Sequence, residues 1–221
     1  PLLLLRGLSS GISIILFFYA MSKISFANAT VLCYTNPIFA AVLGAMFLKE
    51  KLDLKTVALI ITAFAGIILV LKPDFTGTGP GEAAGLLAGF FGGIGSAATR
   101  RLREKNESSF AVVFYFYIYS SLMALPLSYK GLMPDAPEAW LLICAIAVLI
   151  TLALLFSISG YKYCSLATGS ALSLLVVVFS YICGVLFLGE PSGLLSILGA
   201  CLIVFANLFI IMKEKKIPAV E

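Results

Sequence analysis

The chain has 221 residues, of which 61% are hydrophobic and only 12% are charged, and its formal net charge is +4. The basic residues flank long apolar runs, so the positive charge does not indicate nucleic-acid binding, and a mean hydropathy of +1.09 excludes an ordinary soluble domain. The absence of histidine excludes His-based metal and acid/base chemistry, and the five cysteines form no CxxC pair and are interpreted as small buried hydrophobes.

Eight apolar runs follow one another along the chain, and each is long enough for a membrane-spanning helix. A spanning helix needs about 20 mostly apolar residues. Helix is the expected state because single strands cannot satisfy their backbone in lipid and no barrel-type alternation is present. We therefore predict an all-α polytopic bundle of about eight spans, at Leu3–Met21, Ala27–Leu48, Thr56–Leu71, Ala83–Ala98, Phe110–Leu127, Trp140–Ser159, Ala167–Leu188 and Leu194–Met212.

The basic residues predict the orientation of the bundle in the membrane. Of the 15 lysines and arginines, three fall in one set of alternate loops, Lys23, Lys72 and Lys130. The other set holds Arg6, Lys49, Lys51, Lys55, Arg100, Arg101, Arg103, Lys105, Lys162, Lys213, Lys215 and Lys216. Because cytoplasmic loops carry an excess of Lys and Arg, the larger set is expected in the cytoplasm together with both ends of the chain.

One membrane hairpin occurs twice. Phe47-Leu48-Lys49-Glu50 recurs as Phe187-Leu188-Gly189-Glu190, 140 residues later, and each copy ends a long apolar run. Five spans separate the two glutamates, so the copies end on opposite sides of the bilayer, as in the inverted repeats of many secondary transporters. Glu50 and Glu190 are expected to be turn anchors that cap the following span, in positions that suit a gate.

The small residues of the fourth span recur at intervals of four, as Gly85, Gly89, Gly93 and Ala97. This spacing aligns them on one helix face, so a neighbouring backbone can approach closely. Tight packing is one interpretation, and the other adds that Gly92-Gly93 and Gly95-Ser96 leave a helix soft enough to bend during transport.

Polar but uncharged residues are the candidates for a substrate site. No span carries an acid or base in its middle third, which argues against a buried-carboxylate proton antiporter and against intramembrane aspartyl or metallo-enzymes. Pro37 removes a backbone donor and frees the carbonyl of Cys33, so this carbonyl and Asn36 either face a wet cavity or bond to neighbouring helices. The predicted cavity residues are Tyr19, Asn28, Tyr34, Asn36, Pro37, Ser96, Ser157, Tyr161, Ser170 and Ser173.

Several short segments resemble the EamA branch of the drug/metabolite transporter superfamily: Arg6-Gly7, Phe18-Tyr19-Ala20, Ala27-Asn28-Ala29, Asn36-Pro37-Ile38-Phe39 and Leu48-Lys49-Glu50. The resemblance implies ten helices in two inverted five-helix halves. Residues 1–72 would then be the last three helices of the first repeat, 83–213 the complete second repeat and 214–221 a cytoplasmic tail, with two helices of a longer protein preceding Pro1. Val177 replaces the proline expected opposite Pro37.

The sequence thus predicts a secondary transporter that moves an amino-acid-like, nucleoside-like or drug-like metabolite across the cytoplasmic membrane by alternating access. The expected partners are the lipid bilayer and the small-molecule substrate, with no nucleic acid, metal or cofactor, and a homodimer is left open. An accessory membrane subunit without transport of its own is the main alternative. A lipid-modifying membrane enzyme is a second alternative, although no catalytic polar cluster is visible in any loop.

Overall fold

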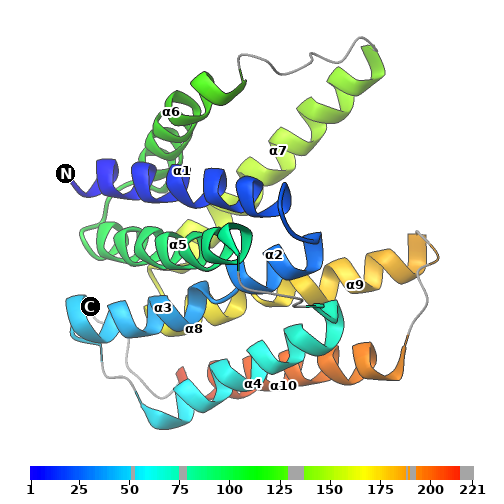
Figure 1. Cartoon of the computed structure of the whole chain (residues 1–221). Helices are drawn as coiled ribbons and strands as arrows, with labels where there is room; N and C mark the ends of the chain where they lie inside the picture. The colour runs from blue at the N-terminus through cyan, green and yellow to red at the C-terminus, as the bar shows by residue number, and fades with distance from the viewer. Residues whose placement is uncertain (51–52, 75–78, 129–136, 188, 190–192, 215–221) are drawn as a thin grey trace.

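The computed structural model describes residues 1–50, 53–74, 79–128, 137–187, 189 and 193–214, and the regular elements among them are all helical (Figure 1). The first half contains α1 (Leu2–Met21), α2 (Phe26–Cys33), α3 (Asn36–Leu43), the π-helical turn η1 (Gly44–Leu48) and α4 (Leu54–Leu71). The second half contains α5 (Pro80–Glu104), α6 (Ser109–Ser128), α7 (Pro137–Gly160), α8 (Leu166–Leu172), α9 (Leu175–Phe187) and α10 (Leu194–Glu214).

The predicted all-α membrane fold is confirmed. Seven helical stretches of the described chain are long and apolar enough to cross a membrane, namely Leu2–Met21, Phe26–Leu48, Leu54–Leu71, Ser109–Pro126, Glu138–Gly160, Leu166–Phe187 and Leu194–Glu214. The remaining long helix is α5, whose 25 residues include many glycines and a charged end. Together these elements correspond to the eight predicted spans.

Helix α5 is longer than the predicted span Ala83–Ala98. At its start, the backbone N–H of Gly79 donates to Glu82 Oε2 at 2.9 Å, which satisfies a donor next to the first turn. At its end, Glu104 pairs with Arg100 at 3.5 Å and with Arg101 at 2.8 Å. Pairs three and four residues apart stabilise a helix, so the arginines that we expected in a loop instead form its last turns.

Both hairpin helices are interrupted at equivalent places. The first breaks between α2 and α3, where Thr35 N–H donates to Leu32 O, and the second breaks between α8 and α9, where Leu174 N–H donates to Ala171 O. Only the first break precedes a proline, since position 177 is valine. The two halves therefore differ in residue type at Val177, as expected, but the backbone of the helix is interrupted in both.

A hydroxyl group binds a carbonyl at each break. Thr35 Oγ1 donates to Leu32 O at 2.6 Å, and Ser173 Oγ donates to Ser170 O at 2.6 Å. At the second break, as at the first, a hydroxyl therefore satisfies one backbone carbonyl.

The small-residue face of α5 packs directly on the first break. A Cβ added to Gly89 would lie 2.9 Å from Leu32 O and 3.0 Å from Cys33 O, and one added to Gly93 would lie 3.1 Å from Ala40 N. This confirms the predicted close approach of a neighbouring backbone. In Figure 1, α5 lies beside α1 and along α2 and α3, while α4 and α10 lie side by side at the other edge of the bundle.

The loops gather at two opposite ends of the bundle, in the two sets that the basic residues predict. Glu50, Arg100 and Tyr161 are joined by hydrogen bonds at what we call the basic end, where Lys213 also pairs with Asp53. At the opposite end, Asn28 binds Asp74, and Gly193 lies beside Lys72. The two hairpins therefore close at opposite ends, as an inverted repeat requires. Lys51, Lys130, Lys215 and Lys216 lie outside the described residues.

Three details differ from the sequence-based expectations. Arg6, which was counted with the membrane-flanking basic residues, is buried within α1, and Glu214, expected in the tail, is the last residue of α10. The cysteines are free but not buried, because Cys144, Cys183 and Cys201 lie on exposed faces of spanning helices and Cys33 and Cys164 are half-buried. In a membrane such exposed positions face lipid or another helix, so an apolar side chain is still suited to them.

Candidate functional site at the interface of the two halves

A cluster of hydroxyl groups lies between α5, α8 and the turn that follows α7. Tyr161 is 8% exposed, and its phenol oxygen lies 3.4 Å from Ser170 Oγ and hydrogen-bonds Ser96. Burial raises the pKa of the Tyr161 phenol, so this group is neutral at physiological pH. Three of the predicted cavity residues, from three separate elements, thus meet at one place.

The side chain of Arg6 lies next to this cluster. It is 9% exposed, and its Nη1 donates to Ser10 Oγ one turn later in α1. The guanidinium also lies 4.8 Å from the centre of the Phe116 ring, which attracts a cation through its π face. Gly95 of α5 makes room for this arrangement, because a Cβ there would lie 2.7 Å from Ser10 Oγ and 3.3 Å from Arg6 Nη1.

Arg6 has no anionic partner among the described residues. The salt bridges in this part of the chain involve Arg100, Arg101 and Lys213 instead, and the buried Nε of Arg6 has no hydrogen-bond partner. A buried charge without a counter-charge is costly, so a guanidinium at this position can bind an anionic group that enters the site. Sequence reasoning missed Arg6, although its spacing of four residues from Ser10 is a signal that it faces the same side of α1.

Asn36 provides an acceptor near the same face of α5. Its Oδ1 is buried without a hydrogen-bond partner, and its side chain lies beside Gly92 together with Ser13. Gly92 and Gly95 are separated by about 4.5 Å along the helix axis. A buried acceptor without a hydrogen-bond partner and a buried cation without a counter-charge therefore border one short stretch of α5.

Glu50 links the two halves at the basic end. Its carboxylate accepts hydrogen bonds from the backbone N–H of Leu166, at 2.9 and 3.1 Å, and from Arg100 Nε at 3.2 Å. Arg100 Nη1 in turn donates to the backbone oxygen of Tyr161 at 2.8 Å. The prediction that Glu50 caps the following span is wrong, because it binds the first residue of α8, which favours a carboxylate through its free N–H groups and helix dipole.

A second acidic clamp occurs in both halves with the same offset of 140 residues. In the first half, Asn28 Oδ1 accepts from Asp74 N–H at 2.9 Å, and Ser25 Oγ donates to Asp74 Oδ1 at 3.2 Å. In the second half, Ser165 N–H donates to Glu214 Oε1 at 2.6 Å, and Thr168 Oγ1 donates to the same carboxylate. Each clamp ties the entry of an interrupted helix to an acidic residue at or just beyond the end of the hairpin's second span, Glu214 at the end of α10 and Asp74 after α4.

The remaining predicted site residues lie elsewhere. Asn28 is engaged by the clamp at the opposite end, and Tyr19 is 44% exposed with Lys23 Nζ 5.9 Å from its ring centre. The others are Pro37, buried at the break, Tyr34, packed against the core around Val31, and Ser157 and Ser173, both exposed. Glu190 lies outside the described residues.

Comparisons with known proteins agree with this architecture. The EamA-like transporter family matches residues 1–72 and 79–212. The Pseudopaline exporter CntI of Pseudomonas aeruginosa is 29% identical over 208 residues, which are 93% of this chain and 73% of that protein. The S-adenosylmethionine uptake transporter of Rickettsia felis is 24% identical over 96% of this chain and 72% of its own length. A crystal structure with a TM-score of 0.82 and 19% identity covers 96% of this chain and 77% of that chain, which supports the fold alone.

Proposed function

The chain belongs to the EamA-like transporter family, and from this premise we propose that it is a secondary transporter that moves a small metabolite across the cytoplasmic membrane by alternating access. Related proteins are named both as an exporter and as an uptake transporter, so membership does not fix the direction of transport. The relatives support transport and not catalysis as the activity. The positive-inside rule supports a cytoplasmic basic end with both chain ends on that side.

The buried, unpaired Arg6 is the observation that carries the proposal. Its free donor and the free acceptor of Asn36 lie at the interface of the two halves, where inverted-repeat transporters bind their substrates. Within the amino-acid-like, nucleoside-like or drug-like range, Arg6 favours a metabolite that carries a carboxylate or phosphate. Ser96, Tyr161 and Ser170 would supply neutral hydrogen bonds beside that group.

The Glu50 clamp supports a gate at the basic end. It joins η1 and the turn after it to α5 and α8, so the bonds of a single carboxylate hold elements of both halves together. In this proposal, opening the basic end breaks these bonds, and closing the opposite end relies on contacts between residues at that end. Alternating access requires that such contacts form at one end of the bundle when they break at the other.

Transport by the purified protein in liposomes tests the proposal. Labelled acidic metabolites would be paired with neutral counterparts, namely aspartate with asparagine and nucleotides with nucleosides. We expect flux of at least one acidic member, a loss of that flux in Arg6→Gln, and partial recovery in Arg6→Lys. The matched control Arg101→Gln removes an exposed arginine that pairs with Glu104 on its own helix and should leave flux unchanged. Flux of the acidic member in Arg6→Gln equal to that in Arg101→Gln would overturn the role of Arg6. No flux of any member from a well-folded protein would overturn transport.

A further inference from the structure

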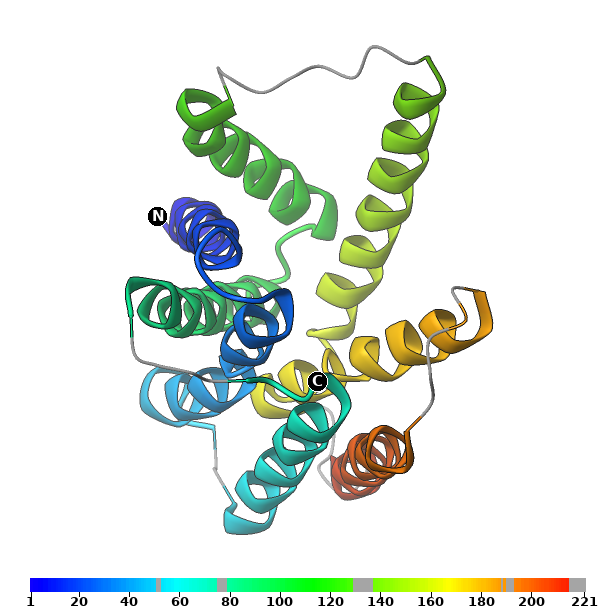
Figure 2. The ribbon, with the colours of Figure 1, turned by 45° about the vertical axis from the view of Figure 1, so that its right-hand side comes forward.

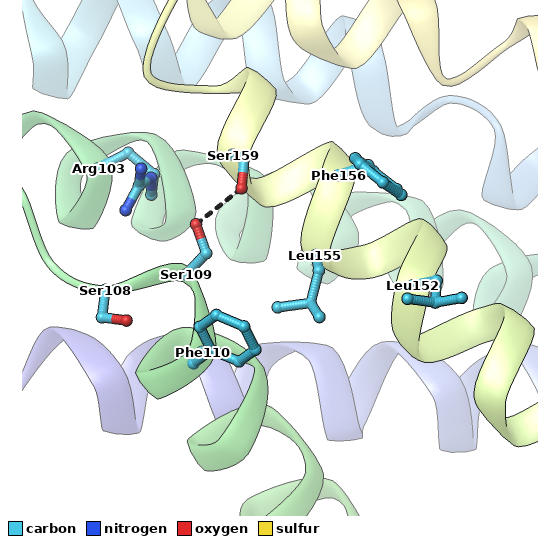
Figure 3. Close-up of a pocket in the computed structure, with 8 residues that line it drawn as sticks. All are labelled: Arg103, Ser108, Ser109, Phe110, Leu152, Leu155, Phe156 and Ser159. Carbon is cyan, nitrogen blue, oxygen red and sulfur yellow. Dashed lines mark hydrogen bonds between the residues drawn. The ribbon is translucent and has the colours of Figure 1, made fainter.

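A groove of about 500 Å³ opens between the ends of α5, α6 and α7, away from the Arg6 cluster (Figure 3). Its walls come from the turn between α5 and α6 on one side and from the last three turns of α7 on the other. Figure 2 shows α6 and α7 spreading apart above this point, with α7 at the margin of the bundle. The groove therefore faces the surroundings of the bundle sideways and lies at the basic end, where the chain leaves the apolar layer.

One part of the groove is polar and cationic. Arg103, Ser108, Ser109 and Ser159 line it, and the Ser109 and Ser159 hydroxyls lie 2.9 Å apart (Figure 3). Arg103 Nη1 donates to the backbone oxygen of Glu107, while its buried Nε has no hydrogen-bond partner. Ser108 and Ser109 also lead into the N-terminus of the 20-residue helix α6, whose free N–H groups favour an anion.

The other part of the groove is apolar and lies along one face of α7. Leu152, Leu155 and Phe156 recur at helical spacing, and Phe110 of α6 lies opposite them (Figure 3). Phe156 is 76% exposed and Leu152 47% exposed. From Ser159 to Leu152 the helix advances about 10 Å toward the middle of the membrane. The groove thus changes from polar to apolar in the direction in which a phospholipid changes from headgroup to acyl chain.

The charges around the groove favour an anionic ligand. The exposed Arg101 and Lys105 lie on the same helix end as Arg103. Of the two nearby acids, Glu104 is paired with Arg100 and Arg101, and Glu107 is exposed on the turn. Basic pockets between spanning helices at the cytoplasmic surface are suited to acidic lipid headgroups.

We propose that this groove binds the phosphate of an anionic phospholipid, with Arg103 and the three serines at the phosphate and the acyl chain along Leu152, Leu155 and Phe156. A diffuse positive surface would attract acidic lipids to many sites, whereas the Arg103 side chain in the wall of the groove and the adjoining apolar face define one site. The ligand is a lipid of the surrounding bilayer and not the transported substrate.

Native mass spectrometry of the purified protein in detergent tests this proposal. Phosphatidylglycerol would be titrated against phosphatidylcholine with identical acyl chains, and glycerol 3-phosphate would be added as a headgroup without chains. We expect one phosphatidylglycerol to bind at least about tenfold more tightly than phosphatidylcholine, in accord with the strength of charge-assisted hydrogen bonds. We expect glycerol 3-phosphate not to displace it at equal concentration, because the phosphate alone lacks the apolar contacts.

Substitution of two arginines, one in the groove and one outside it, tests whether the lipid binds in the groove. Arg103→Gln should reduce phosphatidylglycerol binding about tenfold, while Arg101→Gln, which removes the same charge from the same helix end outside the groove, should change it less than twofold. Equal effects of the two substitutions would overturn the site in favour of diffuse attraction. Equal binding of phosphatidylglycerol and phosphatidylcholine to the unaltered protein would also overturn the proposed lipid site. Full displacement by glycerol 3-phosphate would indicate that the groove binds a soluble anion instead.

Discussion

Replacing Glu50 with glutamine should loosen the basic end of the bundle. Glutamine keeps an oxygen that can accept from the Leu166 N–H, but it loses the charge that faces Arg100 Nε at 3.2 Å. The two side chains are only 16% and 18% exposed, so solvent screens this pair weakly. Hydrogen bonds to charged groups contribute about 1.5–3 kcal/mol, and we expect glutamine to forfeit about 1.4 kcal/mol, which is a tenfold shift toward the open end.

Accessibility of a cysteine behind the clamp measures this shift. In a chain whose five cysteines are replaced, Ser96→Cys places a thiol one turn inside Arg100 on α5. We expect a membrane-impermeant thiol reagent, added from the side of the basic end, to label this cysteine about tenfold faster when Glu50 is glutamine. The thermal unfolding midpoint should fall by only a few degrees, because the rest of the bundle is unchanged.

The matched control is Glu104→Gln. It removes a carboxylate from the same end of the molecule, but its partners Arg100 and Arg101 both lie on its own helix. If labelling stays at the parent rate in Glu50→Gln, or if Glu104→Gln accelerates it equally, the clamp does not hold this end closed.

Three further expectations concern packing, topology and helix entry. Gly89→Ala should lower the thermal unfolding midpoint by several degrees, because a Cβ at Gly89 meets Thr35 Oγ1 and two carbonyl oxygens. Gly92→Ala should not lower it, because a Cβ there meets atoms at 3.4–3.5 Å, and equal midpoints of the two variants would contradict the packing. Burial raises the pKa of the Cys164 thiol to about 11, so maleimide labelling of a variant that keeps only Cys164 should be slow at pH 7 and should rise nearly tenfold per pH unit up to pH 10. Labelling should occur only from the side of the basic end, and a pH-independent rate or labelling from the opposite side would refute this. Glu214→Ala should speed the amide hydrogen exchange of residues 165–168 about fivefold, because loss of a helix cap costs about 1 kcal/mol. Unchanged exchange would show that Glu214 does not hold the start of this helix.

The fold was largely predictable because its main determinants are local. A run of about 20 apolar residues specifies a spanning helix almost regardless of its neighbours. The grouping of loops into two ends followed from Lys and Arg alone. The boundary of α5 was missed because arginines at a membrane surface suit a helix end as well as a loop, and the pairs with Glu104 that favour the helix are visible only as spacing.

The site was less predictable because it depends on which face each helix turns inward. Ser96, Tyr161 and Ser170 were all candidates, but nothing in the sequence indicated that they meet. Arg6 was counted with the basic residues that flank the spans, since a charge near the end of a span ordinarily reaches the membrane surface. The binding of Glu50 to Leu166, 116 positions away, is a tertiary contact that no local pattern predicts.

The break between α8 and α9 bears on how such proteins are compared. Because the chain turns there without proline, a proline at position 37 accompanies the break but is not needed to produce its counterpart. A search for interrupted helices that relies on mid-span prolines therefore overlooks the second half of this chain.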